Sequence, residues 1–134
     1  MKKIIFAALL STTAVSPVFA ANWEMVGQTG DMTIYADKNA AIRSEGKVRM
    51  WSLSDFKTIQ TQEGLKPYLS DISLYEYDCA ERKSRLLQTT SRLGNMGNGE
   101  VAESITMTNP KWRYAVPDSI GESVLNAACR KSKT

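Results

Sequence analysis

The sequence predicts an α+β domain, in which an antiparallel sheet of about six strands carries one C-terminal helix on one face. Three observations favour this fold class: short strand-like segments separated by turn residues, one amphipathic segment near the C-terminus, and an export signal followed by two cysteines. An exported chain with two thiols normally joins them, because the compartment it enters is oxidising. We therefore expect a disulfide between Cys79 and Cys129 that ties the helix to the sheet.

Segments rich in β-branched and aromatic residues and bounded by turn residues are typical of strands. The main strands are expected over residues 23–28, 32–36, 47–57, 68–79, 84–93 and 100–108. Residues 42–43 form a shorter candidate, and residues 109–117 are expected to be irregular. The run from Gly94 to Gly99 predicts a hairpin connection, because Asn and Gly tolerate the positive φ that tight turns require.

The last segment predicts a helix. Ser119 and Glu122 have the spacing of a capping box, in which the serine accepts from a free amide and the glutamate reaches back. The apolar positions after the cap recur at helical spacing and make one stripe, formed by Ile120, Val124, Leu125, Ala128 and Cys129. The helix should therefore pack on a sheet face with Cys129 directed into that face.

Alternation along the strands selects that face. Tyr75, Tyr77 and Cys79 point the same way, so the disulfide places the helix over them. Glu76 and Asp78 point the opposite way and are expected to be exposed, solubilising carboxylates.

Apolar residues also occupy the other face. Trp51 and Leu53 oppose Val48 and Met50 on one strand, and Ile72 lies on the face away from the helix. A helix of about 11 residues is only about 16 Å long and cannot cover both faces. Either the sheet curls into a partial barrel, or this second face meets a ligand or a second copy of the chain as a homodimer.

The N-terminus has the pattern of a bacterial secretory signal. Lys2 and Lys3 precede an uncharged, mainly apolar run, and Val18 and Ala20 stand at the positions that a signal peptidase reads. We expect residues 1–20 to be a signal peptide cleaved after Ala20, and residues 21–134 to form one domain. No cysteine lies near the cut, so we expect no lipid anchor, no transmembrane segment, and a product in the periplasm or at the cell surface.

Composition excludes much familiar chemistry. The chain contains no histidine, which rules out Ser-His-Asp and Cys-His catalysis and the ordinary histidine sites for zinc. With both cysteines assigned to the disulfide, we expect no enzyme activity, no metal and no cofactor.

Charge limits the partners. Of 17 Lys and Arg, Lys2 and Lys3 leave with the signal, so 15 face 14 Asp and Glu and the net charge is about +1. A nucleic-acid footprint needs a clustered basic excess, so we expect no nucleic acid and favour a protein partner. Local basic groups on one predicted strand and the turn before it are candidate contacts for an acidic partner: Arg82, Lys83, Arg85 and Arg92.

The residues also resemble a known family along nearly the whole expected mature chain. The motifs that carry the resemblance are Trp23 to Val26, Ile34-Tyr35-Ala36-Asp37, Val48-Arg49-Met50-Trp51, Ser73-Leu74-Tyr75-Glu76-Tyr77-Asp78-Cys79, Arg82, Arg85-Leu86-Leu87, Gly99-Glu100-Val101, Trp112, Val116-Pro117, and Ser119 before a helix that ends in Cys129. On these motifs the chain resembles the surface-adhesin protein E-like domain of Gram-negative bacteria.

The resemblance implies about six antiparallel strands, a helix disulfide-bonded onto them, and dimerisation. It also implies a non-enzymatic binding domain for host extracellular-matrix or serum proteins, or for another envelope protein. The family's adhesin is anchored and has been credited with haem binding; this chain has no lipid-attachment cysteine and no histidine to ligate haem. Two other functions stay open, a periplasmic inhibitor of a lysozyme-type enzyme and an envelope structural protein without a ligand.

Overall fold

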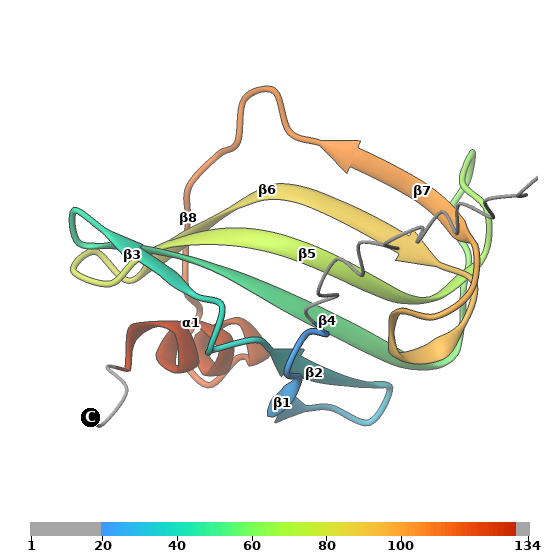
Figure 1. The fold of residues 1–134 in the computed structure, drawn as a ribbon, viewed down its shortest axis with the longest axis horizontal. Helices are drawn as coiled ribbons and strands as arrows, with labels where there is room; N and C mark the ends of the chain where they lie inside the picture. The colour runs from blue at the N-terminus through green and yellow to red at the C-terminus, as the bar shows by residue number, and fades with distance from the viewer. Residues whose placement is uncertain (1–19, 131–134) are drawn as a thin grey trace, which may run out of the picture.

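The computed structural model describes residues 20–130, and the expected signal segment before Ala20 lies outside this range. Figure 1 shows a curved sheet with one helix packed near its lower edge. The elements follow in the order β1 (Glu24–Gln28), β2 (Met32–Ala36), β3 (Ile42–Ser44), β4 (Lys47–Gln60), β5 (Tyr68–Asp78), β6 (Lys83–Arg92), the 3₁₀ turn η1 (Asn95–Gly97), β7 (Val101–Thr106), β8 (Arg113–Tyr114) and α1 (Ile120–Cys129).

The sheet confirms the predicted architecture. Six strands lie in the order β1-β2-β4-β5-β6-β7, β3 adds to β4, β8 adds to β6, and the strand pairs of the described residues are antiparallel. The prediction that residues 109–117 are irregular is wrong at β8, where Arg113 and Tyr114 pair with Ser84 and Lys83. Two residues are too few to show alternation, so only the pairing with β6 defines this strand.

The helix begins as the capping motif predicts. Ser119 Oγ accepts a hydrogen bond from Glu122 N at 3.2 Å. The return bond shifts by one residue, because Ser119 N already donates to Val116 O and the Glu122 carboxylate accepts from Asp118 N at 3.3 Å instead. The first turn of the helix is therefore capped from both sides.

The core lies between the helix and the sheet face that alternation selects. Met50 of β4 and Leu125 of α1 belong to one core cluster and are almost fully buried. Tyr77 of β5 lies in the same cluster and is 2% exposed. The cluster consists of Ile34, Ala36, Val48, Met50, Tyr77, Val124, Leu125 and Ala128. Burial of these side chains stabilises the fold by roughly 1.5–3 kcal/mol for each large one.

The predicted disulfide is present. Cys79 follows β5 directly, Cys129 is the last residue of α1, and their Cα atoms lie 5.6 Å apart. One arginine holds the helix end beside it. Arg43 donates to the carbonyl oxygens of Ala128 and Arg130, at 2.8 Å each. The helix end is thus fixed to the sheet both covalently and by hydrogen bonds.

The face away from the helix, which we call the open face, is covered in part by the chain itself. Leu53 is fully buried on this face although it lies outside the core cluster. The β6–β7 connection folds over it: Ser70 Oγ donates to Gly94 O at 2.6 Å and accepts from Gly97 N at 2.9 Å. The Asp55 carboxylate accepts from Met96 N at 2.7 Å. The 94–99 loop therefore covers one end of the open face, and it leaves the rest of that face uncovered.

Candidate binding face

At the other end of the open face, three charged residues lie side by side on adjacent strands. The register pairs Arg49 of β4 with Glu76 of β5, and Glu76 with Arg85 of β6. Arg49 Nε lies 2.9 Å from one carboxylate oxygen of Glu76, and Arg85 donates to the other from Nη2 at 2.6 Å and from Nε at 2.9 Å. Each oxygen of Glu76 therefore has an arginine partner.

Glu76 is buried, which corrects the expectation of an exposed carboxylate. Its side chain is 7% exposed, whereas that of Arg49 is 54% exposed. Burial by itself would raise the pKa of Glu76, but the hydrogen bonds and charges of Arg49 and Arg85 outweigh it and hold that pKa below the ordinary value. Glu76 therefore stays ionised and fixes two guanidinium groups at the surface.

Aromatic residues extend this arrangement. The guanidinium carbon of Arg85 lies 4.4 Å from the centre of the Trp112 ring, a cation–π distance. Lys83 Nζ lies 5.4 Å from Trp112 and 6.0 Å from Tyr114, which is 71% exposed. Trp112 thus touches two cations of β6 from the chain segment that leads into β8.

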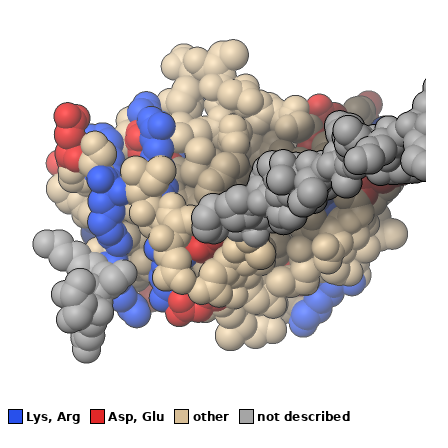
Figure 2. Space-filling model, in the orientation of Figure 1, with Lys and Arg blue, Asp and Glu red and all other residues tan. Residues whose placement is uncertain are grey.

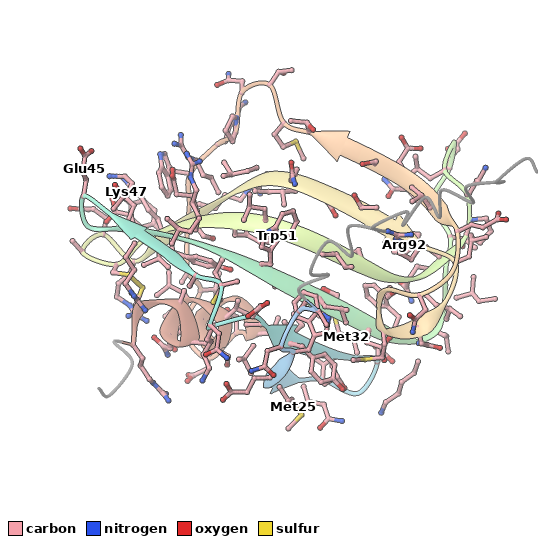
Figure 3. The ribbon with its side chains drawn as sticks, viewed as in Figure 1. Met25, Met32, Glu45, Lys47, Trp51 and Arg92 are labelled. Carbon is pink, nitrogen blue, oxygen red and sulfur yellow. A yellow bond between two sulfur atoms is a disulfide. The ribbon has the colours of Figure 1, made fainter. Side chains whose placement is uncertain are left out.

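We call Lys47, Arg49, Lys83 and Arg85 the basic cluster. Lys47, Arg49 and Arg85 are each paired with a carboxylate whose side chain is less exposed than their own. The side chain of Lys47 is 42% exposed and that of its partner Asp78 is 14% exposed, with 4.0 Å between the charged atoms. Figure 2 shows several Lys and Arg side chains gathered at this end of the molecule, with some Asp and Glu among them. Glu45 projects from the tip of the β3–β4 turn beside Lys47 (Figure 3). The surface here is positive because the cations lie outermost.

The structure separates the four basic residues that the sequence suggested. Lys83 and Arg85 belong to the basic cluster. Arg82 lies on the turn between β5 and β6 and donates to Asn126 of the helix at 2.9 Å. Arg92 lies at the far end of β6 (Figure 3), where its Nη1 donates to Gly99 O at 3.1 Å. These two arginines connect elements of the fold, and no sequence signal distinguished them from the other two.

A shallow hollow of about 680 Å³ occupies the middle of the open face and is lined by Trp23, Trp51 and Ile72. Asp37, buried to 6% exposure, lies at its rim and accepts from Asn22 N at 3.2 Å and Ala40 N at 3.1 Å. Two of the three tryptophans thus line a cavity large enough for a small ligand. The third, Trp112, belongs to the neighbouring basic end.

The comparison with protein families decides what kind of domain this is. The family model described as surface-adhesin protein E matches residues 23–130, which is most of the chain. The chain belongs to the surface-adhesin protein E family. The match includes the strand that carries Glu76, the segment that carries Trp112 and both cysteines. A comparison with curated protein sequences finds no match.

Solved structures show the same fold. The structure of Haemophilus influenzae protein E matches with a TM-score of 0.59 and 11% sequence identity, over 87% of this chain and 90% of that one. Its selenomethionine form matches with a TM-score of 0.57 and 12% identity, over 83% and 92% of the two chains. At this identity the likeness establishes the fold alone.

Two further observations concern residues 20–130. Within them, no helix is long and apolar enough to cross a membrane. No group of three or more His, Cys, Asp or Glu side chains in this range is arranged to hold a metal ion.

Sequence reasoning missed three residues of the site. Arg49 and Lys47 stand on a strand that its apolar positions predict, and Trp112 stands in a segment expected to be irregular. The signal that could have found Arg49 is its alternation with Trp51 and Leu53, which places it on the face of Glu76. Trp112 had no such signal, because its position depends on β8.

Proposed function

We propose that this chain is a non-enzymatic, exported adhesin-like domain that binds an acidic protein partner through the basic cluster. Membership of the surface-adhesin protein E family supports the adhesin class. The main support for placing the binding site here is the Arg49–Glu76–Arg85 arrangement with Trp112 beside it. A buried carboxylate that holds two cations at the surface suits recognition of anionic groups.

Fixed cations favour binding because less side-chain entropy is lost on association. Arg85 is held both by Glu76 and by the Trp112 ring, and its side chain is 28% exposed. Arg49 shares the same carboxylate, so both guanidinium groups have defined positions before a partner arrives. Lys47 and Lys83 are the flexible members that steer an acidic surface toward this end.

The partner class follows the family: a host extracellular-matrix or serum protein, or an envelope protein, with an acidic surface. The proposal includes export by cleavage after Ala20, with the product in the periplasm or at the cell surface. Mass spectrometry of protein recovered outside the cytoplasm should give a chain that starts at Ala21. Self-association as a homodimer stays a prediction, which light scattering of the purified mature chain tests.

A binding screen tests the proposed function. Mature protein would be immobilised and exposed to a panel of matrix and serum proteins, and the best binder measured at two ionic strengths. Lys47→Gln/Lys83→Gln should weaken binding about tenfold, with the loss shrinking at high salt. The control Lys57→Gln/Lys66→Gln removes the same charge from the opposite end of β4 and the loop after it. Equal losses in the two double variants would show that net charge alone matters, and the assigned site would be wrong.

A further inference from the structure

Strand β6 has a gap in its outer edge. β8 pairs with Lys83 and Ser84, and β7 pairs only from Gln88 onward. Between these pairings the chain from β7 to β8 loops away from β6, as the orange segment in Figure 1 shows. Leu86 therefore has no strand partner on this side among the described residues.

The backbone of Leu86 faces this gap. Ala115 N donates to Arg82 O at 3.0 Å, so Arg82 directs its backbone groups to the outer edge. In a regular antiparallel ladder every second residue does so, which makes Ser84 and then Leu86 the next ones. Directly after Leu86 the β5–β6 register shifts by one residue, so Leu87 also directs its carbonyl to the outer edge. The loop itself bonds β6 only beyond that point, where Met107 N donates to Leu87 O at 2.8 Å. Among residues 20–130 the β7–β8 loop makes no backbone hydrogen bond to Leu86, so this stretch of the β6 edge is open to a ligand.

A pocket of about 360 Å³ opens at this gap. It is bounded by Leu86 and Ser84 of β6, by Tyr75 of β5, and by Asn109, Lys111 and Arg113 from the segment between β7 and the end of β8. None of the residues that line it is Asp or Glu. Lys111 and Arg113 are exposed, and neither has an ion-pair partner in the described part of the chain. The pocket is therefore a concave, positively charged site with hydroxyl and amide groups in its wall.

We propose that this pocket binds the carboxylate of an Asp or Glu side chain on an extended segment of the acidic protein partner. The inference rests on the proposed function and names a second contact point for the same partner. Lys111 and Arg113 supply the charge, and an arginine can hold both oxygens of one carboxylate. The Leu86 edge supplies a donor and an acceptor for the backbone of the segment, as in strand addition at a sheet edge.

The free backbone edge is what selects a peptide over a sulfated glycan. A peptide backbone presents a carbonyl and an N–H to the strand edge at the spacing of a neighbouring strand, whereas the hydroxyl and sulfate groups of a glycan do not repeat at that spacing. The volume suits one side chain and a short stretch of backbone, because it lies at the small end of ligand-pocket sizes of about 300–1,000 Å³. The pocket also lies beside Arg85 and Trp112, so one segment can reach the basic cluster and the pocket together.

Binding of a fluorescent hexaglutamate peptide to the mature chain, followed by anisotropy at low ionic strength, tests the proposal. Lys111→Gln/Arg113→Gln should weaken binding about tenfold, because the two exposed cations that face the carboxylate are removed. The control Lys57→Gln/Lys66→Gln should leave binding within about twofold. In ¹⁵N NMR spectra, the Leu86 amide should shift on addition of the peptide in the wild type and not in the pocket variant.

The outcomes separate the two proposals. Equal binding by the wild type and the pocket variant, or an unmoved Leu86 amide, overturns the pocket assignment while the basic cluster stands. No hexaglutamate binding by the wild type removes the acidic-partner function together with the pocket. A heparin fragment that depends on Lys111 and Arg113 more strongly than the peptide does overturns the choice of a peptide occupant.

Discussion

A carboxylate oxygen of Glu76 lies 2.6 Å from Nη2 of Arg85, and the guanidinium carbon of the same arginine lies 4.4 Å from the centre of the Trp112 ring. Three segments meet in this contact: the consecutive strands β5 and β6, and the approach to β8. Arg49 of β4 shares the same carboxylate. Glu76 is therefore the residue on which the geometry of the basic end depends.

Replacing Glu76 should destabilise the fold as well as the site. Glu76→Gln removes a buried charge from two arginines, and we expect the free energy of unfolding to fall by about 2 kcal/mol at neutral pH. Because the pKa of Glu76 is lower in the folded protein than its ordinary 4.5, its contribution is complete above pH 4.5 and is lost as the pH falls through the folded value. Urea unfolding of the wild type and the variant from pH 7 to pH 3 measures this. A constant difference over that range would contradict the assigned linkage.

Asp71 should behave in the opposite way. Burial raises its pKa, and the hydrogen bonds from Ser54 and Ser73 offset this only in part. A carboxyl with a raised folded pKa costs stability as the pH rises from its ordinary value of 3.8 through the folded value. Asp71→Asn should therefore raise the unfolding midpoint at pH 7 and make no difference near pH 3. Thermal melts at the two pH values check this, and a lower midpoint for the variant at pH 7 would count against it.

The 94–99 loop should be sensitive to one methyl group. Gly97 has φ +73°, and a Cβ there would lie 2.8 Å from Ile72 Cδ1 and 3.3 Å from Leu53 Cδ1. Gly97→Ala should destabilise the fold by about 1–3 kcal/mol, through both the crowding and the left-handed backbone. Gly30→Ala is the matched control, because a Cβ at Gly30 meets nothing within 4 Å. Chemical denaturation of both variants decides the matter; similar losses would mean that the loop does not seal the open face.

The disulfide should contribute a large share of the stability. Cys79 and Cys129 are 50 residues apart, and closing a loop of that length contributes about 4 kcal/mol in the chain-entropy model. Cys79→Ala/Cys129→Ala, or mild reduction, should lower the melting temperature markedly. Hydrogen exchange should rise first in α1, because Arg43 and Arg82 then hold it without a covalent link. An unchanged melting temperature would show that packing alone anchors the helix.

Much of the fold is readable from local pattern. Alternation along residues 68–79 identifies both the strand and the face that receives the helix, and Ser119 with Glu122 marks where that helix begins. The pairing of Cys79 with Cys129 needs only a count of cysteines and an oxidising compartment. These signals are periodic or compositional, so they can be recognised in the sequence without knowing which segments lie side by side in the fold.

Strand register decided the rest. Glu76 is buried because β4 and β6 place Arg49 and Arg85 on either side of it. The residues next to Glu76 in the sequence do not indicate these partners. Arg82 and Arg92 became links within the fold, and Trp112 became part of the site, through contacts with distant segments. The sequence by itself determined which residues form strands and helix and which face is apolar, since those properties repeat along the chain. Only the tertiary structure decided which charges are paired, covered or left at the surface, because that depends on which strands lie side by side.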